Sequence, residues 1–259
     1  MKKVNLFCLS IFIIGVFFVI SCIPCSFAQE AEVNTPGAIF YQANIYYQEA
    51  KYAAAIQGYQ RLLDLGLESG NLYYNLGNSY FKEGQLGLAV LNYDKAMGFI
   101  PNDSDLKSNY NYVLQELNLE PRLFGGWFER SVYSLFKGMT VDALTILLSF
   151  IYIVLIVFFT CSLFFNRFKR SIGLSAGILI VLFILSAYAL KMKINYLNKF
   201  AVVIIKEANA KFEPLENATV YFKLKQGSKV EIVDKADGWY KVRRFDDKLA
   251  WVKKDALRN

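Results

Sequence analysis

The architecture of this chain is decided by the stretch 144-LTILLSFIYIVLIVFFTCSLFF-165, 166-NRFKR-170, 171-SIGLSAGILIVLFILSAYAL-190. Its two outer segments, 22 and 20 residues long, contain no Lys, Arg, Asp or Glu, whereas the five residues between them include three basic ones. At about 1.5 Å per residue, each apolar segment makes a helix roughly 30 Å long, which matches the hydrocarbon core of a bilayer. Because both segments are apolar on every face, the stretch predicts a transmembrane hairpin rather than two helices of a soluble core.

The predicted hairpin consists of a first span at 141–165, a cytoplasmic loop at 166–170 and a second span at 171–190. Both flanking regions then lie on the same side of the membrane. Residues 1–28 begin with two lysines, continue with an apolar run and end in small residues, which is the layout of a secretory signal peptide. A lipoprotein leader modified at Cys22 and an uncleaved anchor are the alternatives. All three place the following region outside the cytoplasm.

Composition narrows the chemistry of the two soluble regions. The chain has no histidine, and its four cysteines lie in the leader and in the first span, at Cys8, Cys22, Cys25 and Cys161. The soluble regions therefore lack the commonest general base and any cysteine that could form a disulfide or hold zinc. No nucleophile elbow or phosphate-binding loop is present in the sequence. We expect a protein that is not an enzyme, with no catalytic residue, metal site or cofactor.

The net charge of +7 is unevenly distributed along the chain. Residues 29–120 contain 5 basic and 11 acidic residues, whereas residues 200–259 contain 13 basic and 9 acidic ones. A nucleic-acid-binding domain concentrates basic charge on one folded surface. This distribution therefore argues against nucleic acid as a partner.

After a polar linker at 29–36, residues 37–120 predict an α-helical solenoid. Tyr46, Ala55 and Tyr59 recur 34 residues later as Tyr80, Ala89 and Tyr93. A period of 34 residues is typical of stacked helical hairpins. The second copy resembles the tetratricopeptide repeat at eight positions: Tyr73, Leu76, Gly77, Tyr80, Ala89, Tyr93, Ala96 and Pro101. The small residues let the two helices cross closely, the tyrosines fill the space between them, and the proline ends the second helix.

A further helix is predicted after the repeats, capped by Asp103 or Ser104. Its apolar face is formed by Leu106, Tyr110, Val113, Leu114 and Leu117. It closes the end of the stack. Two repeats and one helix make a minimal solenoid, so a partner or a second copy of the chain is expected to support it.

The predicted partner-binding surface is the concave face of the solenoid. It repeats one pattern twice, with the residues Phe40, Asn44, Tyr47 and Tyr74, Asn78, Phe81. The spacing places the amide and both rings of each copy on one helix face. The amides are suited to the backbone of an extended protein or peptide ligand, and the rings supply contact area. The alternative is that the rings pack between helices and the amides are merely solvated.

Residues 121–140 combine aromatic side chains with basic ones directly before the first span. Such a composition suits the headgroup zone of a bilayer. The segment is therefore predicted to form a short interfacial helix, with an unstructured linker as the alternative.

Residues 200–259 change from a helical to a β pattern. Short β-rich runs occur at 202–205, 220–224, 230–233, 239–242 and 249–252, with turns between them. Five short strands in 60 residues predict a small all-β barrel. The sequence around Gly238, Trp239 and Trp251 resembles a bacterial SH3-like domain. These residues are expected in the barrel core, with a ligand platform as the alternative for the two tryptophans. The acidic loops of proline-binding SH3 domains are not evident, so polyproline recognition is not predicted.

Taken in order, these parts resemble one component of the Bacteroides aerotolerance (Bat) operon, a multi-domain membrane protein family with tetratricopeptide repeats, two transmembrane helices and a C-terminal SH3-like domain. The element Asp105-Leu106-Lys107-x-Asn109 after the last repeat also recurs in that family. The resemblance implies an envelope protein, and the leader together with the hairpin predicts a bacterial inner-membrane location with both soluble domains in the periplasm. It also implies work with membrane-anchored von Willebrand A-domain proteins and a MoxR-type ATPase.

Two functions follow as expectations. The first is a membrane-anchored adaptor or scaffold that binds protein partners in the envelope, in an aerotolerance or stress-related complex. The hairpin would keep both soluble domains within reach of each other, which raises their effective concentration. The alternative is a protein that binds or senses cell-wall peptidoglycan through its SH3-like domain.

Overall fold

The computed structural model describes residues 35–120, 126–164 and 169–259. The predicted leader at 1–28 and nearly all of the linker at 29–36 lie outside the described residues. The chain divides into two compact units, Met1–Ile39 and Phe40–Asn259, and the contacts described below are those of the second unit.

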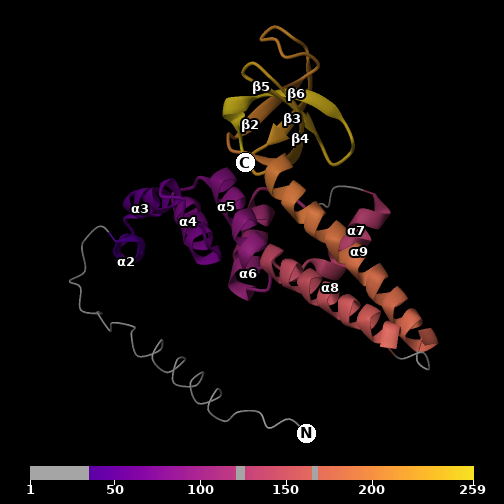
Figure 1. The fold of residues 1–259 in the computed structure, drawn as a ribbon. Coiled ribbons are helices and arrows are strands. Elements are labelled where there is room, and N and C mark those ends of the chain that lie inside the picture. Colours follow the sequence, from indigo (N-terminus) through magenta and orange to yellow (C-terminus); the bar gives the residue numbers. More distant parts are fainter. Residues whose placement is uncertain (1–34, 121–125, 165–168) are drawn as a thin grey trace. The chain divides into compact units, whose positions relative to one another are not determined.

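The first part of this unit is helical, as predicted. Its helices are α2 (Pro36–Gln48), α3 (Tyr52–Asp64), α4 (Gly70–Lys82), α5 (Leu86–Phe99) and α6 (Ser104–Glu116) (Figure 1). Two of them begin at side-chain caps: the Ser69 hydroxyl accepts from the backbone N–H of Leu72, and the Asp103 carboxylate accepts from that of Leu106. These caps satisfy N–H groups that the first turn of a helix leaves without a partner. We refer to α2–α6 as the repeat helices.

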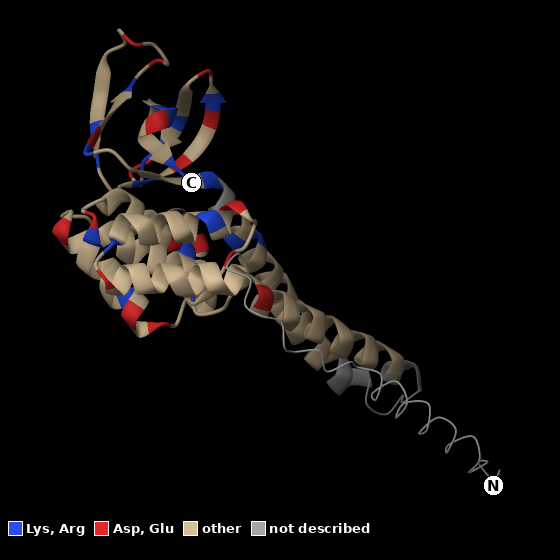
Figure 2. Ribbon diagram, turned by 90° about the vertical axis from the view of Figure 1, so that its left-hand side faces the viewer, with Lys and Arg blue, Asp and Glu red and all other residues tan. Residues whose placement is uncertain are grey.

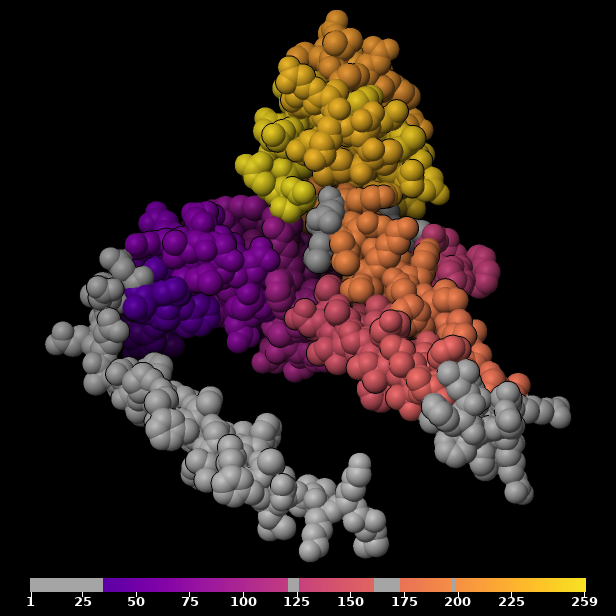
Figure 3. Space-filling view, viewed as in Figure 1, coloured from indigo at the N-terminus to yellow at the C-terminus, as the bar shows by residue number. Residues whose placement is uncertain are grey.

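Three more helices follow: α7 (Trp127–Phe136), α8 (Val141–Phe164) and α9 (Lys169–Lys199). The prediction of two long apolar helices is confirmed, because Val141–Thr160 and Gly173–Tyr196 are each long and apolar enough to cross a membrane. Only 11% of each apolar window is buried. They pack side by side (Figure 3).

The ends of the hairpin differ from the prediction. Helix α9 begins at Lys169, so the last two residues of the expected loop at 166–170 are helical, and residues 165–168 lie outside the described residues. At its other end α9 continues to Lys199 rather than ending at Leu190. The extra residues contain neither glycine nor proline, so nothing in the sequence stops the helix where its apolar run ends. Charged residues are scarce along the two long helices (Figure 2).

Helix α7 lies against α9. Its Val132 is buried together with Leu144 and Ala189, and the Phe128 ring lies 5.6 Å from that of Tyr188. The opposite side of α7 leaves Trp127 81% exposed. The helix expected at 121–140 is therefore present from residue 127, while residues 121–125 lie outside the described residues.

The C-terminal part is an antiparallel sheet, as predicted, with the order β3-β2-β6-β5-β4-β1-β7. The strands are β1 (Phe200–Val203), β2 (Glu207–Lys211), β3 (Val220–Lys225), β4 (Lys229–Ala236), β5 (Trp239–Arg243), β6 (Leu249–Lys253) and β7 (Leu257–Arg258). Small and branched apolar residues such as Val203, Val230 and Val252 form its core. Strands β2 and β7 were not predicted. Strand β2 reads Glu-Ala-Asn-Ala-Lys, and β7 has only two residues, so neither carries β-rich composition.

Candidate functional sites

The six residues predicted to bind a partner lie on α2 and α4, and all of them are half-buried. We call this set the ladder face: Phe40, Asn44, Tyr47, Tyr74, Asn78 and Phe81. Its two copies make the same contacts. The Tyr59 hydroxyl donates to Asn44 Oδ1 at 2.6 Å, and the Tyr93 hydroxyl donates to Asn78 Oδ1 at 2.7 Å. The geometry thus repeats with the 34-residue period of the sequence.

Each of these amide oxygens also accepts a second hydrogen bond. Asn75 Nδ2 donates to Asn44 Oδ1, and Asn109 Nδ2 donates to Asn78 Oδ1, both at 3.0 Å. A carbonyl oxygen has two lone pairs, so neither oxygen has capacity left for a ligand. A ligand on this face would meet the N–H groups of the two amides. It would therefore need to offer acceptors, such as backbone carbonyls.

Three rings of the ladder face pack against the second helix of their own repeat, and Phe81 packs against α6. Phe40 lies 5.8 Å from Tyr59, and Tyr74 lies 6.1 Å from Tyr93. At the other end of each pattern, Tyr47 packs on Tyr52 and Phe81 packs on Tyr112. The rings therefore belong partly to the interior, and the contact between helices accounts for much of their arrangement.

Asn75 and Asn109 were not among the predicted site residues. They are 34 residues apart, and each donates to the asparagine of the preceding copy. Asn109 lies on α6, where it also donates to the Tyr74 hydroxyl. The repeated spacing was visible in the sequence. Helix α6 therefore contributes to the ladder face the same contact that α4 contributes one repeat earlier.

Burial keeps the hydroxyls of this network protonated to a higher pH than that at which an exposed tyrosine ionises. It raises the pKa of Tyr59 to about 12, despite an opposing effect of the Asn75 amide. Burial, followed by the neighbouring Tyr74 and Tyr47, likewise raises the pKa of Tyr93. Both hydroxyls remain donors at neutral pH, which keeps the amides of Asn44 and Asn78 in one orientation.

The eight repeat-signature residues form the interior of the second helical hairpin. Seven of them are buried in α4 and α5, and Pro101 is buried just beyond the end of α5. Gly77 has a specific reason to be glycine, because a Cβ atom there would lie 2.7 Å from the Tyr93 ring. Helix α5 ends at Phe99, with Ile100 at its C-cap.

A second candidate surface lies on the C-terminal sheet and was not predicted. We call it the aromatic patch: Phe212, Tyr221, Phe222, Arg244, Phe245 and Lys248. The Phe212 and Tyr221 rings stack at 4.5 Å, and Tyr221 lies 5.2 Å from Phe222. The Arg244 guanidinium lies 4.3 Å from the centroid of Phe222. Phe212 is 56% exposed.

Two ion pairs order the charges of the aromatic patch, and both use Asp246: Arg244 is one partner, and Lys248 Nζ lies 3.6 Å from Asp246 Oδ2. Arg244 donates through Nε and Nη2 to the two carboxylate oxygens of Asp246, at 2.7 and 2.6 Å. This bidentate bond holds the pKa of Asp246 well below its usual range. Lys248 lies over the Tyr221 ring at 5.8 Å. The patch thus presents flat rings edged by fixed cations.

The three residues predicted in the barrel core take different positions. Trp239 is 8% exposed, and the ammonium groups of Lys211 and Lys253 lie over its ring. Trp251 is half-buried beneath Lys241. Gly238 is exposed in the turn between β4 and β5, with φ of +70°, a conformation that favours glycine.

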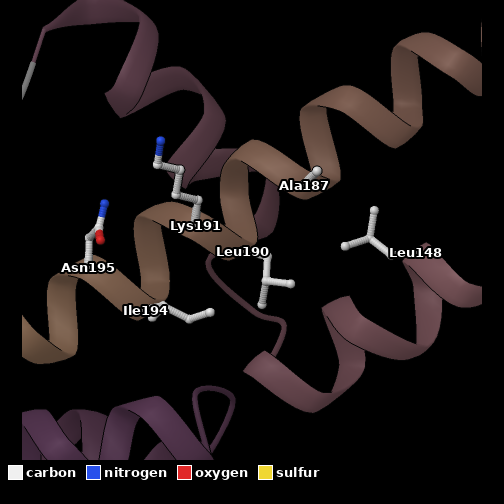
Figure 4. Close-up of a pocket in the computed structure, with 6 residues that line it drawn as sticks. All are labelled: Leu148, Ala187, Leu190, Lys191, Ile194 and Asn195. Carbon is white, nitrogen blue, oxygen red and sulfur yellow. The ribbon is translucent and has the colours of Figure 1, made fainter.

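A shallow groove separates α8 from α9 (Figure 4). Leu148, Leu190 and Ile194 give it an apolar lining, and the ammonium group of Lys191 points away from Leu148. Within the described ranges of the chain, no group of three or more acidic or cysteine residues is arranged to hold a metal ion.

Comparison with known proteins identifies one part of the chain. Residues 206–258 match the bacterial SH3 domain family. The match begins after β1, so the strand that follows α9 lies outside it. No curated protein matches the chain. The prediction of a bacterial SH3-like domain is confirmed, and this domain carries the aromatic patch.

Proposed function

We propose that this protein is a non-enzymatic binding protein of the bacterial envelope, anchored by α8 and α9, whose SH3 domain binds the cell wall through the aromatic patch. The exposed, stacked rings of Phe212 and Tyr221 carry this proposal. They occur on a domain of a bacterial SH3 family. Flat exposed rings are suited to sugar faces and to extended peptides, and both occur in peptidoglycan.

The charge of the aromatic patch supports the same ligand. Arg244 and Lys248 border the rings, and Arg244 is oriented by Asp246. Together with Asp246 these side chains carry a net positive charge, which attracts the carboxylates of the peptide stems of cell-wall polymers. A ligand that is both saccharide and acidic peptide would use both parts of the patch.

The apolar helices support the envelope location. Two helices long enough to span a bilayer form a hairpin, and α7 presents exposed aromatic residues beside them. We place the connection between α8 and α9 in the cytoplasm and both soluble parts in the periplasm. A periplasmic reporter enzyme fused to the C-terminus should be active, and activity only of a cytoplasmic reporter would contradict this topology.

Co-sedimentation with purified sacculi tests the binding proposal, using the full chain in detergent. The variant combining Phe212→Ala and Tyr221→Ala should lose at least tenfold in apparent affinity. The matched control is Tyr112→Ala, which removes a 60% exposed ring from α6. Wild-type protein that stays in the supernatant, or a patch variant that sediments like the control, would exclude cell-wall binding by this surface.

The second candidate function is that of an adaptor or scaffold, and the ladder face favours it. The side-chain oxygens of Asn44 and Asn78 each accept the same two hydrogen bonds, from a tyrosine and from an asparagine. The N–H groups of these two amides are left to donate to the backbone carbonyls of an extended peptide. The repeat helices, which we interpret as tetratricopeptide repeats, would hold a protein partner. By family resemblance we propose von Willebrand A-domain proteins and a MoxR-type ATPase, in an aerotolerance-related complex. A second copy of the chain is a further candidate.

Affinity purification of the full chain from detergent-solubilised membranes tests the adaptor. Wild-type protein should retain von Willebrand A-domain proteins, and a variant combining Tyr47→Ala and Phe81→Ala should lose them. These rings carry no part of the amide network. The Phe212→Ala and Tyr221→Ala variant serves as control and should retain the partners. Reproducible absence of such proteins from the wild-type eluate would count against the adaptor.

A further inference from the structure

A largely shielded ion pair joins two parts of the chain that are far apart in sequence. Lys229 Nζ on β4 lies 2.5 Å from Asp94 Oδ1 on α5, across 135 residues of sequence. Each side chain is only 18% exposed, whereas those of the surface pair Lys223–Glu207 are 62% and 51% exposed. A pair shielded from water interacts more strongly and is less screened by salt. This contact thus connects the repeat helices to the SH3 domain.

The second apolar helix supplies a third member of the same cluster. The Tyr196 hydroxyl on α9 donates to Asp94 Oδ1 and Oδ2, at 3.0 and 3.1 Å, and accepts a hydrogen bond from Lys229. Tyr110 on α6 also interacts with the Lys229 ammonium group. We call Asp94, Lys229, Tyr196 and Tyr110 the junction cluster. It contains residues from the repeat helices, the apolar hairpin and the SH3 domain.

The charge of the cluster depends on all its members. Burial by itself lowers the pKa of Lys229, but the Asp94 carboxylate and the hydroxyls of Tyr110 and Tyr196 outweigh burial and raise that pKa well above its usual range. Lys229 therefore stays charged, and it needs Asp94 as its counter-ion. Removing either partner leaves an uncompensated charge in a shielded position, which favours separation of the surfaces and entry of water.

Two glycines lie where the repeat helices and the SH3 domain approach too closely for a side chain to fit between them. A Cβ atom on Gly87, inside α5, would lie 2.7 Å from the Val203 carbonyl oxygen on β1. A Cβ atom on Gly227, in the β3–β4 turn, would lie 2.5 Å from Leu117. Gly87 is the second residue of α5, and it is not a repeat-signature position. The contact with β1 explains it.

The connection between α9 and the SH3 domain has no linker. Helix α9 ends at Lys199 and β1 starts at Phe200, and the Phe200 ring lies 4.6 Å from that of Tyr196. Strand β1 pairs with both β4 and β7. Because no residue separates α9 from β1, the domain could rotate only about the backbone of Lys199 and Phe200, and such a rotation would separate the Phe200 ring from Tyr196.

We propose that the junction cluster is a rigid joint that holds the repeat helices, the SH3 domain and the C-terminal end of α9 as one body. The two candidate binding surfaces then keep a constant separation and orientation. A force on the SH3 domain reaches α9 directly, because no flexible segment absorbs it. This proposal does not depend on which ligand either surface binds.

Distance measurements between two spin labels test the joint in the full chain. Labels are attached at Gln57→Cys on α3 and Val233→Cys on β4, both exposed positions, after the four native cysteines are replaced by serine. The otherwise unchanged protein should give one narrow distance distribution. Asp94→Asn and Lys229→Gln should each at least double its width. The control Lys223→Gln, which removes the exposed ion pair, should leave the width unchanged.

Two further variants separate the joint from a general loss of folding. The charge-swapped variant with Asp94→Lys and Lys229→Asp should recover most of the narrow width, which a merely unfolded protein would not do. Gly87→Leu, which changes no charge, should broaden the distribution by separating the surfaces, while the helical circular dichroism persists. A broad distribution in the otherwise unchanged protein, or an unchanged width in both Asp94→Asn and Lys229→Gln, would overturn the proposal.

Discussion

The ladder face of the repeat helices and the aromatic patch of the SH3 domain both gather aromatic side chains, but they use them differently. On the ladder face every ring packs on a ring of another helix, and both amide oxygens are occupied. On the aromatic patch the rings stack on one another, with Phe212 56% exposed. The side chains of the ladder face mainly hold the helices together and leave only a few N–H donors for a ligand. The rings of the aromatic patch mainly offer exposed surface to a ligand.

This difference means that the two surfaces should respond differently to substitution. Substitutions in the hydrogen-bond network of Asn44 and Asn78 should lower the stability of the protein, because they leave shielded polar groups without partners. Changes in the aromatic patch should cost binding but little stability, because its rings are already in contact with water. The following experiments measure that contrast.

The largest effect is expected from Tyr93→Ala. Tyr93 is 1% exposed, fills the space beside Gly77 and donates to Asn78. Its removal should lower the free energy of unfolding by about 3–5 kcal/mol, measured by urea titration of the helical circular dichroism. Tyr41→Ala, at a 67% exposed ring of α2, is the control and should change little. Equal losses in both variants would remove the distinction between interior and surface rings.

Asn78→Ala comes next, because it leaves the Tyr93 hydroxyl and the Asn109 amide without their shared acceptor. The expected loss is about 2–3 kcal/mol in the same titration. Asn44→Ala should behave alike, since its contacts are the same. Asn71→Ala, at an exposed position of α4, should be neutral. If Asn78→Ala is as stable as Asn71→Ala, the amide is not part of the framework.

Alkaline pH should lower the free energy of unfolding through Tyr59, the residue that donates to Asn44 of the ladder face. An unfolded tyrosine ionises near pH 10, whereas the folded pKa of Tyr59 is about 12. Stability is therefore fully present below pH 10 and falls between pH 10 and 12, because only the unfolded state loses its proton there. We expect a loss of about 1–2 kcal/mol. Tyr59→Phe should reduce this alkaline loss, and an identical pH profile would contradict the assignment to Tyr59.

The smallest effect on stability is expected from the double substitution Phe212→Ala and Tyr221→Ala. Both rings are substantially exposed, so the free energy of unfolding should change by less than about 1 kcal/mol. Thermal melting followed by circular dichroism measures this. If the patch variant melts far below the wild type, the patch rings stabilise the fold of the SH3 domain. A loss of binding by that variant would then need a separate control for folding.

Much of the fold was predictable because its signals are local. The apolar segments at 144–165 and 171–190 are continuous, and the 34-residue recurrence is a matter of spacing. The ends of elements were harder to place. Helix α9 runs on to Lys199 because no residue interrupts it. Strand β2 has the composition of a helix or loop, and its pairing with β3 and β6 makes it a strand.

The candidate sites were predictable only in part. The sequence placed Asn44 and Asn78 on one face with two rings each, but it did not indicate that their oxygens were already occupied. That depends on Tyr59 and Tyr93 from other helices and on Asn75 and Asn109 from the following copy. The aromatic patch was missed because Phe212, Tyr221 and Arg244 come from different loops and strands.

The sequence by itself determined the order and class of the parts: repeat helices, an apolar hairpin and a small β domain. Helical period, apolar length and strand alternation depend on neighbouring residues, so they can be read along the chain. Only the tertiary structure decided how the parts are joined. Asp94, Tyr196 and Lys229 are unremarkable where they stand in the sequence, and they become a joint because folding brings them together in a site shielded from water. That shielding turns a weak surface attraction into a specific contact.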